Sequence, residues 1–182
     1  MKQEETQKML DGLRKYVIQQ SRSNLTRLTK NNTKTLYGSI DGELIAYPNS
    51  IRLSFSMEDY GWYQDQGVKG KTSGSKAPSS PFRFGSGTGK KGGLTKGINK
   101  WVRQRGIKFR DKETGKMLTY KSTAFLITRS IYHKGMRPSL FFTKPFQAAL
   151  DRLPTEFMEA YSLDMQKLLN GIMKENFKQN GK

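Results

Sequence analysis

The first residues of the chain follow a helical pattern of apolar positions. Residues 3–20 carry an apolar stripe at helical spacing and predict an amphipathic helix. The polar stretch 21–34 predicts the fraying end of this helix and a loop. The predicted stripe consists of Met9, Leu13, Tyr16, Val17 and Gln20.

The next segments of the chain have the character of β-strands. Segments 35–40 and 43–48 flank Asp41-Gly42, a dipeptide favoured in two-residue hairpin turns, so they predict two paired strands. Pro48-Asn49 predicts the next turn. Residues 50–57 then alternate cleanly, which is typical of a half-buried antiparallel strand. Its apolar face consists of Ile51, Leu53, Phe55 and Met57.

The middle of the chain combines a long non-periodic stretch with two helical patterns. Residues 67–93 show no period and are rich in Gly, Ser and Lys, so they predict a flexible insertion loop. Helices are predicted at 94–105 and 121–133. Between them, residues 108–120 predict a hairpin or loop that turns near Gly115.

The C-terminal part predicts an extended segment and a last helix. Residues 135–145 read as extended, because a proline lies near each end. Pro154 suits the first turn of a helix that continues to about residue 175, and 176–182 predict a frayed tail. We therefore expect one α+β domain over residues 1–182: a small twisted antiparallel sheet packed by N-terminal, central and C-terminal helices.

The charged residues of the chain limit the kinds of binding partner that it can have. The 182 residues include 33 Lys and Arg against 15 Asp and Glu, a formal net charge of +18. Such a chain attracts polyanions: nucleic acid, an acidic protein surface or an anionic membrane. The alternative is a generally solvated basic surface. No stretch has the roughly 18 apolar residues of a membrane span, and the N-terminus lacks the apolar core of a signal peptide, so we expect no membrane partner and no export.

Candidate catalytic chemistry is sparse. The absence of cysteine excludes thiolate metal sites and cysteine nucleophiles, and His133 is the only histidine. The sequence Gly70-Lys71-Thr72 ends like a phosphate-binding loop, but Asp65 stands where that motif needs glycine. We expect no enzyme, cofactor or metal; a nuclease with a carboxylate metal site is the catalytic alternative. Its carboxylates would come from Asp59, Asp65, Asp111 and Glu113, which show no recognisable spacing.

A basic run is the firmest binding signal. From Lys69 to Arg110 the chain has twelve basic residues and no Asp or Glu. Such a run can follow a phosphate backbone, with salt-dependent affinity and without reading sequence. Alternatively, it orders against a neighbouring subunit. The predicted contact residues are Lys69, Lys71, Lys76, Arg83, Lys90, Lys91, Lys96, Lys100, Arg103 and Arg105.

Two short motifs carry a family resemblance. One is "YGWYQDQG" at 60–67, and the other is "MRPSLFFTKPFQAAL" at 136–150. With the order of elements, they resemble the tail-completion and head–tail joining proteins of tailed bacteriophages. In that family a "Y-A-x-Y-V-E-x-G-T"-like motif ends a strand, a variable loop follows, and an "R-P-F-L-x-P-A-L"-like motif leads into the last helix. The matching positions are Tyr60, Tyr63, Gln66, Gly67, Arg137, Pro138, Phe142, Pro145 and Leu150.

The chain departs from the family pattern in three ways. Its loop between the motifs is longer, the helical region 94–133 is added, and Gln66 replaces a common acidic residue. The resemblance implies a non-enzymatic virion protein of the neck or tail, assembled in the host cytoplasm. It implies a hexameric or dodecameric ring that contacts portal, connector or tail proteins, and non-specific contact with genomic DNA. The alternative function is a sequence-independent nucleic-acid-binding protein.

The same segments supply the predicted subunit interface. Rigid amphipathic rings such as those of 60–63 are enriched at interface cores. Phe141 and Phe142 point to opposite sides of an extended segment, so one ring could meet the core and the other a neighbour, or both could fill the core. The predicted interface residues are Tyr60, Trp62, Tyr63, Gln66, Arg137, Pro138, Phe141 and Phe142.

Overall fold

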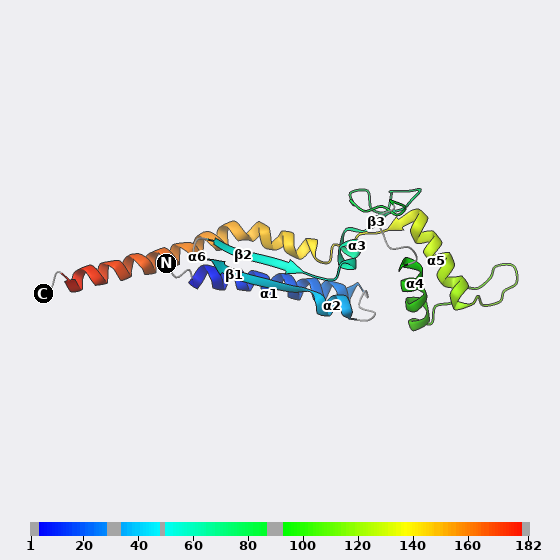
Figure 1. The fold of residues 1–182 in the computed structure, drawn as a ribbon, viewed down its shortest axis with the longest axis horizontal. Coiled ribbons are helices and arrows are strands. Elements are labelled where there is room, and N and C mark those ends of the chain that lie inside the picture. Colours follow the sequence, from blue (N-terminus) through cyan, green and yellow to red (C-terminus); the bar gives the residue numbers. More distant parts are fainter. Residues whose placement is uncertain (1–3, 29–33, 48–49, 87–92, 180–182) are drawn as a thin grey trace. The chain divides into compact units, whose positions relative to one another are not determined.

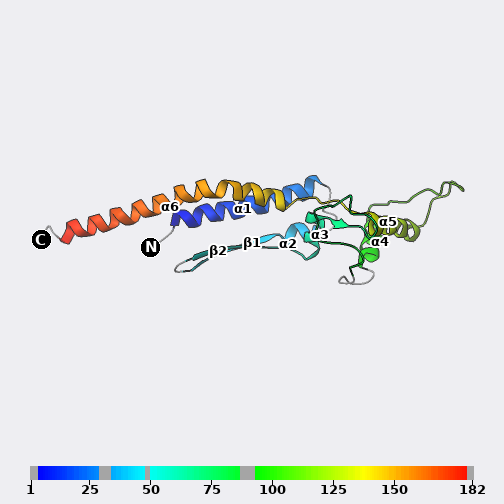
Figure 2. The same cartoon turned by 90° about the horizontal axis from the view of Figure 1, so that it is seen from above.

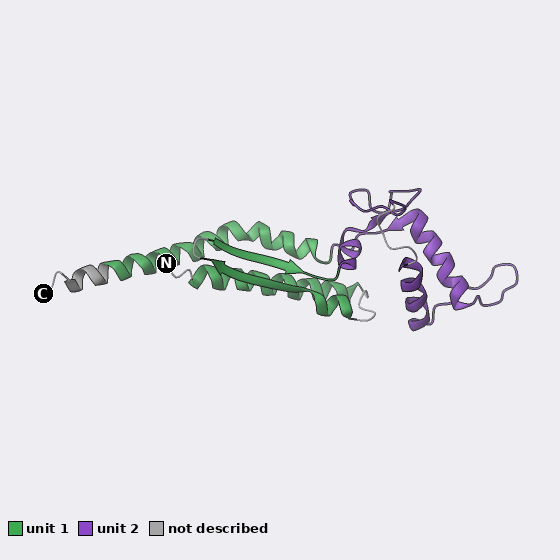
Figure 3. Cartoon of the chain, in the orientation of Figure 1, with its two compact units in different colours: residues 1–58, 141–182 green, residues 59–140 purple. Residues whose placement is uncertain are grey.

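A computed structural model of the chain describes residues 4–28, 34–47, 50–86 and 93–179. The described residues form an α+β fold, as predicted, with six helices and two separate pairs of antiparallel strands. The chain divides into two compact units (Figure 3), and the single domain expected over residues 1–182 stays a prediction. Unit 1 comprises residues 1–58 and 141–182, and unit 2 comprises residues 59–140.

The first helix of unit 1 is longer than predicted. Helix α1 spans Glu4–Arg27, beyond the expected end at residue 20. The reason is that buried positions recur every four residues, at Leu13, Val17, Ser21 and Leu25, so one side of the helix stays packed beyond residue 20.

The predicted strand at 35–40 is wrong. Thr35–Ser39 forms a short helix, α2, with Leu36 buried. Arg22 holds this turn in place, because its guanidinium donates to the carbonyls of Tyr37 (3.1 Å) and Ile40 (2.9 Å). Tertiary contacts of this kind override the weak local preference of a five-residue segment.

The hairpin of unit 1 joins different segments from those predicted: the second expected strand, 43–48, pairs with the strand that follows it and not with 35–40. Strand β1, Asp41–Tyr47, pairs antiparallel with β2, Ser50–Ser56, so Asp41-Gly42 begins a strand and does not form a turn. The alternating face of β2 is half-buried, as predicted. Tyr47 pairs with Ser50, and the expected turn residues 48–49 between them lie outside the described residues.

Unit 1 is built on two antiparallel helices. Helix α6, Thr143–Gln179, lies beside α1, and the hairpin β1–β2 lies along α1 (Figures 1 and 2). Phe141 and Phe142 are buried where the chain enters α6, and the Phe55 ring meets Phe142 edge-on at a centroid distance of 5.6 Å. The fully or nearly buried apolar core consists of Leu13, Val17, Leu25, Leu36, Ile40, Phe141, Phe142 and Ala149.

Helix α6 also differs from its prediction. Pro154 lies inside this 37-residue helix and does not begin it. An interior proline lacks the N–H of one helical hydrogen bond and costs about 3 kcal/mol. The packing of Phe146 and Ala149 against the core holds the preceding turns in the helix and offsets this cost. The helix enters the expected tail 176–182 and reaches Gln179, and 180–182 lie outside the described residues.

A buried carboxylate joins the two long helices. Asp164 of α6 is 2 % exposed and accepts hydrogen bonds from the backbone N–H groups of Glu5 and Thr6, each at 3.0 Å, and from the Thr6 hydroxyl at 2.9 Å. It therefore caps the N-terminus of α1 from another element. Burial opposes its ionisation, but these hydrogen bonds outweigh burial and hold the pKa of Asp164 below its ordinary value.

This cap gives unit 1 a predictable acid sensitivity. Because the folded pKa of Asp164 is lowered, its stabilisation is present above the ordinary value of 3.8 and is lost as the pH falls through the folded pKa. We expect Asp164→Asn to lower the unfolding free energy at pH 7 by about 1.5–3 kcal/mol and to weaken its fall below pH ~4. Urea unfolding followed by circular dichroism measures both. Asp151→Asn, at an exposed position of the same helix, is the control; equal losses in the two variants would contradict the cap.

Unit 2 contains the central helices. Helix α4 spans Gly93–Gln104 and α5 spans Tyr120–Lys134, close to the predicted limits, and the two helices contact each other. Val102 and Ala124 are buried in these helices. The remaining elements of unit 2 are α3 (Tyr60–Gln66), β3 (Val68–Lys69) and β4 (Gly135–Met136).

The predicted loop 67–93 has structure over its described part, residues 67–86. The backbone N–H of Lys71 donates to the Tyr132 carbonyl (2.9 Å), and that of Thr72 donates to the His133 carbonyl (3.2 Å). The Lys76 ammonium donates to the Gly135 carbonyl (3.3 Å). These bonds satisfy carbonyls at the C-terminal end of α5, which otherwise lack partners within the helix. The loop thus caps α5. Capping of this kind does not require a periodic pattern of apolar residues in the loop.

Candidate functional site: the motif junction and the basic surface of unit 2

The two family-like motifs meet in unit 2. The Ser139 N–H donates to the carbonyls of Gln64 (3.1 Å) and Asp65 (3.0 Å), and the Leu140 N–H donates to Asp65 (3.0 Å). The Ser139 hydroxyl also donates to the Gln64 carbonyl (2.6 Å). Strands β3 and β4 then pair antiparallel, with Val68 opposite Met136. We call this contact the motif junction: residues 64–69 against residues 135–140.

Gly67 has a physical reason to be glycine at this junction. Its φ of +71° favours glycine, and a Cβ there would lie 2.6 Å from the Met136 carbonyl oxygen and 2.7 Å from the Pro138 nitrogen. A side chain at residue 67 would therefore separate the two motifs.

The aromatic residues of the first motif lie on a helix. The family resemblance implies that these residues end a strand, but β2 ends at Ser56 and residues 60–66 form α3. Exposed fractions are 39 % for Tyr60, 44 % for Trp62 and 46 % for Tyr63. The Tyr63 ring also meets Phe82 edge-on at 4.6 Å between centroids. An exposed aromatic surface on a helix next to the junction suits a protein contact.

The other predicted interface residues divide into surface and core. Arg137 and Pro138 are exposed, and Gln66 is half-buried, donating to the Asp65 carboxylate at 2.8 Å. Phe141 (0 % exposed) and Phe142 (7 %) are both buried in unit 1. Of the two alternatives, that one ring contacts a neighbour or that both fill the core, the second therefore holds. These two side chains are therefore not available to contact a neighbouring copy, because the tightly packed core of unit 1 surrounds them.

The basic charge is concentrated in unit 2. Residues 59–140 hold 18 of the 33 basic residues and four of the 15 acidic residues, a net charge of +14. The remaining 15 basic and 11 acidic residues leave +4 for unit 1. The carboxylate of Asp65 is buried, so unit 2 presents few surface charges that oppose the cations. The excess positive charge, on which the expectation of a polyanionic partner rests, therefore lies mainly in this unit.

Helix α4 separates cations from apolar side chains. Lys96, Lys100 and Arg103 are four and three residues apart, so they share one side of the helix, and all are exposed. Ile98 and Val102 lie on the opposite side, where Val102 is fully buried. This arrangement leaves three cations available to successive phosphates or carboxylates.

Cations and an aromatic ring meet where α5 begins. The Arg103 guanidinium carbon lies 5.9 Å from the centroid of the Tyr120 ring, and the Lys108 ammonium lies 4.6 Å from it. Such contacts are worth about 0.5–1 kcal/mol at exposed sites. Lys108 belongs to the basic run but not to the predicted contact residues, and Tyr120 was missed, because its partners lie 12 and 17 positions away with no period to reveal them.

A hairpin arm, residues 109–118, extends this surface. The Leu118 N–H donates to the Phe109 carbonyl (2.8 Å), and Arg110 bridges to Met117 in antiparallel pairing. Gly115 has φ +66°, which confirms the predicted turn. Arg110 and Met117 are exposed. The arm adds cations that the predicted contact set lacks: Arg110, Lys112 and Lys116.

The predicted basic loop residues differ in their availability. Lys71 and Arg83 are exposed, whereas Lys69 is half-buried in β3 and Lys76 caps α5. Arg105 is exposed after α4. Lys90 and Lys91 lie outside the described residues. Among the described residues of the basic run 69–110, two exposed cations thus lie on the loop, and the other exposed cations lie on α4 or follow it.

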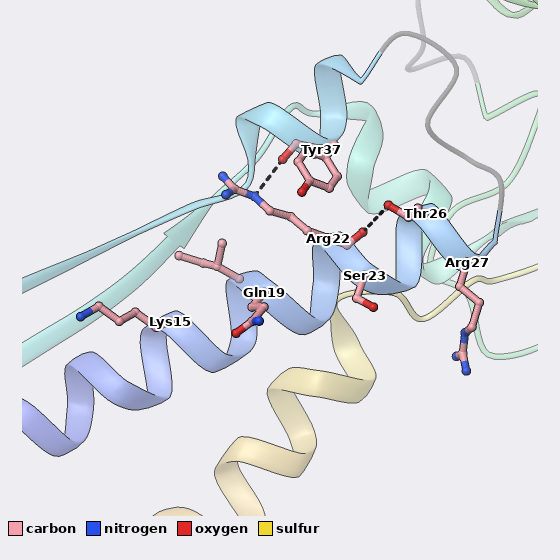
Figure 4. Close-up of a pocket in the computed structure, with 8 residues that line it drawn as sticks. Lys15, Gln19, Arg22, Ser23, Thr26, Arg27 and Tyr37 are labelled. Atoms are coloured by element: carbon pink, nitrogen blue, oxygen red, sulfur yellow. Dashed lines mark hydrogen bonds between the residues drawn. The ribbon is translucent and has the colours of Figure 1, made fainter.

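A groove in unit 1 offers a different surface. It measures about 800 Å³ and runs between α1 and α2 (Figure 4). The Arg22 guanidinium is already bound to backbone carbonyls and lies 5.4 Å from the Tyr37 centroid. None of the lining side chains is a carboxylate, histidine or cysteine, so they provide no acid–base pair. The lining residues are Lys15, Ile18, Gln19, Arg22, Ser23, Thr26, Arg27 and Tyr37.

Two of the candidate carboxylates, those of Asp111 and Asp65, have structural roles within unit 2. Asp111 accepts from the backbone N–H groups of Thr114 and Glu113, each at 2.9 Å, and these bonds lower the pKa of Asp111 and fix the turn of the arm. Asp65 is buried at the junction. Within the described ranges, no three His, Cys, Asp or Glu side chains gather in a way that could hold a metal ion.

Comparison with protein-family models, with curated proteins and with solved structures gives no match to this chain. Among the helices described, none has the length and apolar character needed to cross a bilayer.

Proposed function

We propose that the chain is a non-enzymatic structural protein of a tailed bacteriophage particle. It acts in the neck or tail, where copies form a ring that joins head to tail or completes the tail. The motif junction is the single observation that carries this proposal. The "YGWYQDQG" and "MRPSLFF" segments are about 70 residues apart in sequence, yet residues 64–65 hydrogen-bond to 139–140.

The junction accounts for the departures from the family pattern. Lys69 and Gly135 are paired neighbours, so residues 70–134, here called the insertion, leave and rejoin the chain at adjacent points. An insertion closed in this way lengthens the variable loop without separating the motifs. The added helices α4 and α5 then lie outside the junction itself and can reach a portal, connector or tail protein.

The exposed surface of α3 is the proposed contact between copies. Trp and Tyr dominate binding energy when a partner covers them, since they bury large areas at low entropic cost. Tyr60 and Trp62 are both more than a third exposed beside the junction. In a closed ring this surface meets a different patch of the next copy.

A second candidate function is sequence-independent nucleic-acid binding. It is favoured by the +14 net charge of unit 2, the exposed cations of α4 and those of the arm. The same positive charge is also consistent with the ring proposal, because genomic DNA passes through the neck of the particle. The two functions differ in whether the chain assembles without DNA.

Native mass measured over a concentration series tests the ring proposal. We expect discrete closed species without DNA, and we expect Trp62→Ala to raise the concentration at which they form by about 30-fold, equivalent to about 2 kcal/mol. Tyr47→Ala is the matched control, because Tyr47 is equally exposed at 44 % but lies in β1. A chain that stays monomeric throughout and loads onto duplex DNA only at low salt contradicts the ring and favours the second candidate.

A further inference from the structure

Helix α6 carries a second apolar stripe that does not face the core of unit 1. Its core side presents Phe146, Ala149 and Leu153. On another side, Phe157 and Leu168 are each 38 % exposed and Ile172 is 46 % exposed. All seven members of this stripe are exposed or half-buried: Leu150, Pro154, Phe157, Tyr161, Met165, Leu168 and Ile172.

The spacing of this stripe is regular. Successive members are 4, 3, 4, 4, 3 and 4 residues apart, so an 11-residue unit occurs twice, from Leu150 to Tyr161 and from Tyr161 to Ile172. An 11-residue repeat averages about 3.67 residues per turn and drifts little around an α-helix. The stripe therefore stays on one side of α6 over roughly 33 Å, at 1.5 Å per residue.

The charges of α6 mark out a different side. Arg152, Glu156 and Glu159 lie on the side of the helix opposite the stripe, as their positions in the helical period require. Arg152 also pairs with Glu156 at 3.9 Å. None of the seven stripe members is charged. An uncharged apolar stripe suits neither a nucleic acid nor a strongly charged protein surface, and it does suit an identical stripe.

We propose that α6 pairs with α6 of a second copy of this chain, antiparallel and centred on Tyr161. The order of spacings reads the same in both directions, so an antiparallel copy matches it member by member. Leu150 of one copy lies beside Ile172 of the other, and Phe157 lies beside Met165. The antiparallel direction also sets the two helix dipoles in a favourable arrangement. An isologous contact of this kind pairs copies two by two.

The size of the stripe limits the strength of this contact. A stripe of roughly 33 Å by about 10 Å covers on the order of 300 Å² per copy, below the roughly 800 Å² of a standard stable interface. We therefore expect a weak dimer whose population depends on the protein concentration. The contact does not rest on the proposed virion function, since it needs only a second copy of the chain.

Single cysteines test the pairing directly, because the chain has none of its own. We expect Tyr161→Cys to form a disulfide-linked dimer on mild oxidation, because an antiparallel pair brings this position next to itself. Leu150→Cys alone should not cross-link, whereas a mixture of Leu150→Cys and Ile172→Cys should. Leu163→Cys is the matched control: Leu163 is 48 % exposed but lines the crevice between α6 and α1.

Sedimentation equilibrium provides an independent measurement. We expect Leu168→Glu to raise the dimer dissociation constant at least about tenfold, as for a charge at an apolar contact. Leu163→Glu should change it less than twofold, and Trp62→Ala should leave the Tyr161→Cys cross-link unchanged. Self-linking of Leu150→Cys, equal linking of the Tyr161 and Leu163 variants, or an unchanged constant for Leu168→Glu would each overturn the proposal. Circular dichroism shows whether each variant is folded.

Discussion

Replacement of the insertion, residues 70–134, by an Asn-Gly turn is expected to leave unit 1 folded and to abolish binding to duplex DNA. Lys69 and Gly135 are an antiparallel pair, so a two-residue turn can join them. The core of unit 1 draws all its members from residues 13–57 and 141–153. The hydrogen bonds between residues 64–65 and 139–140 also remain. The shortened chain therefore keeps the motif junction.

The effect on DNA binding follows from charge. The insertion holds 16 basic and two acidic residues, so its removal lowers the net charge from +18 to +4. Each phosphate contact contributes about 0.9 to the slope of log affinity against log salt. We expect affinity for a labelled duplex at about 100 mM salt to fall at least 100-fold. Fluorescence anisotropy over a salt series measures affinity, and circular dichroism on heating measures the stability of unit 1.

A smaller variant separates charge from shape. Replacement of Lys96, Lys100 and Arg103 by Gln keeps α4 and removes its exposed cationic stripe. If all three side chains contact phosphates, the magnitude of the slope of log affinity against log salt concentration falls by about 2.7. Retention of full DNA affinity by the shortened chain would place the binding outside the insertion and remove the basis of the second candidate function. Loss of the unit 1 melting transition would contradict the division of the chain into two compact units.

The periodic segments were the predictable part of the fold. Residues 94–105, 121–133 and 50–57 form elements close to their expected limits, because one face of each must be buried and burial imposes a period. The strand expected at 35–40 was not predicted correctly, since a guanidinium from α1 determines its conformation. The hydrogen bonds of residues 71–72 to the carbonyls of α5 were not predictable either. Such contacts join residues that are distant in the sequence and leave no local signal.

Only part of the candidate site agrees with the expectation from the sequence, since Phe141 and Phe142 are buried in the core of unit 1. Tyr60, Trp62 and Tyr63 were identified and are exposed. The junction rests mainly on backbone hydrogen bonds between 64–65 and 139–140, which join residues that are distant in the sequence and leave no local pattern. The Tyr120 contact with two cations and the concentration of charge in unit 2 also required the structure, because they depend on where the chain folds back.

Substitution of Gly70 by alanine is expected to break the base of the insertion. Gly70 follows β3, and its N–H donates to the Ser73 carbonyl at 2.8 Å. A Cβ there would lie 2.0 Å from the His133 carbonyl oxygen and 2.6 Å from the Gly135 nitrogen. Both atoms are backbone and cannot rotate away, so the strand or the end of α5 must move. Overpacking in a well-packed region costs typically 1–3 kcal/mol, and we expect a loss at or above about 3 kcal/mol here.

The two tryptophans make this loss measurable in unit 2 alone. Trp62 and Trp101 both belong to unit 2, so tryptophan fluorescence in a urea titration reports its unfolding. Gly74→Ala is the matched control, because its Cβ would make only ordinary contacts, 3.8 and 3.9 Å from the Lys69 side chain. We expect the fluorescence midpoint to fall sharply for Gly70→Ala and to stay unchanged for Gly74→Ala. Equal midpoints for the two variants would mean that β3 and α5 do not approach as closely as the junction requires.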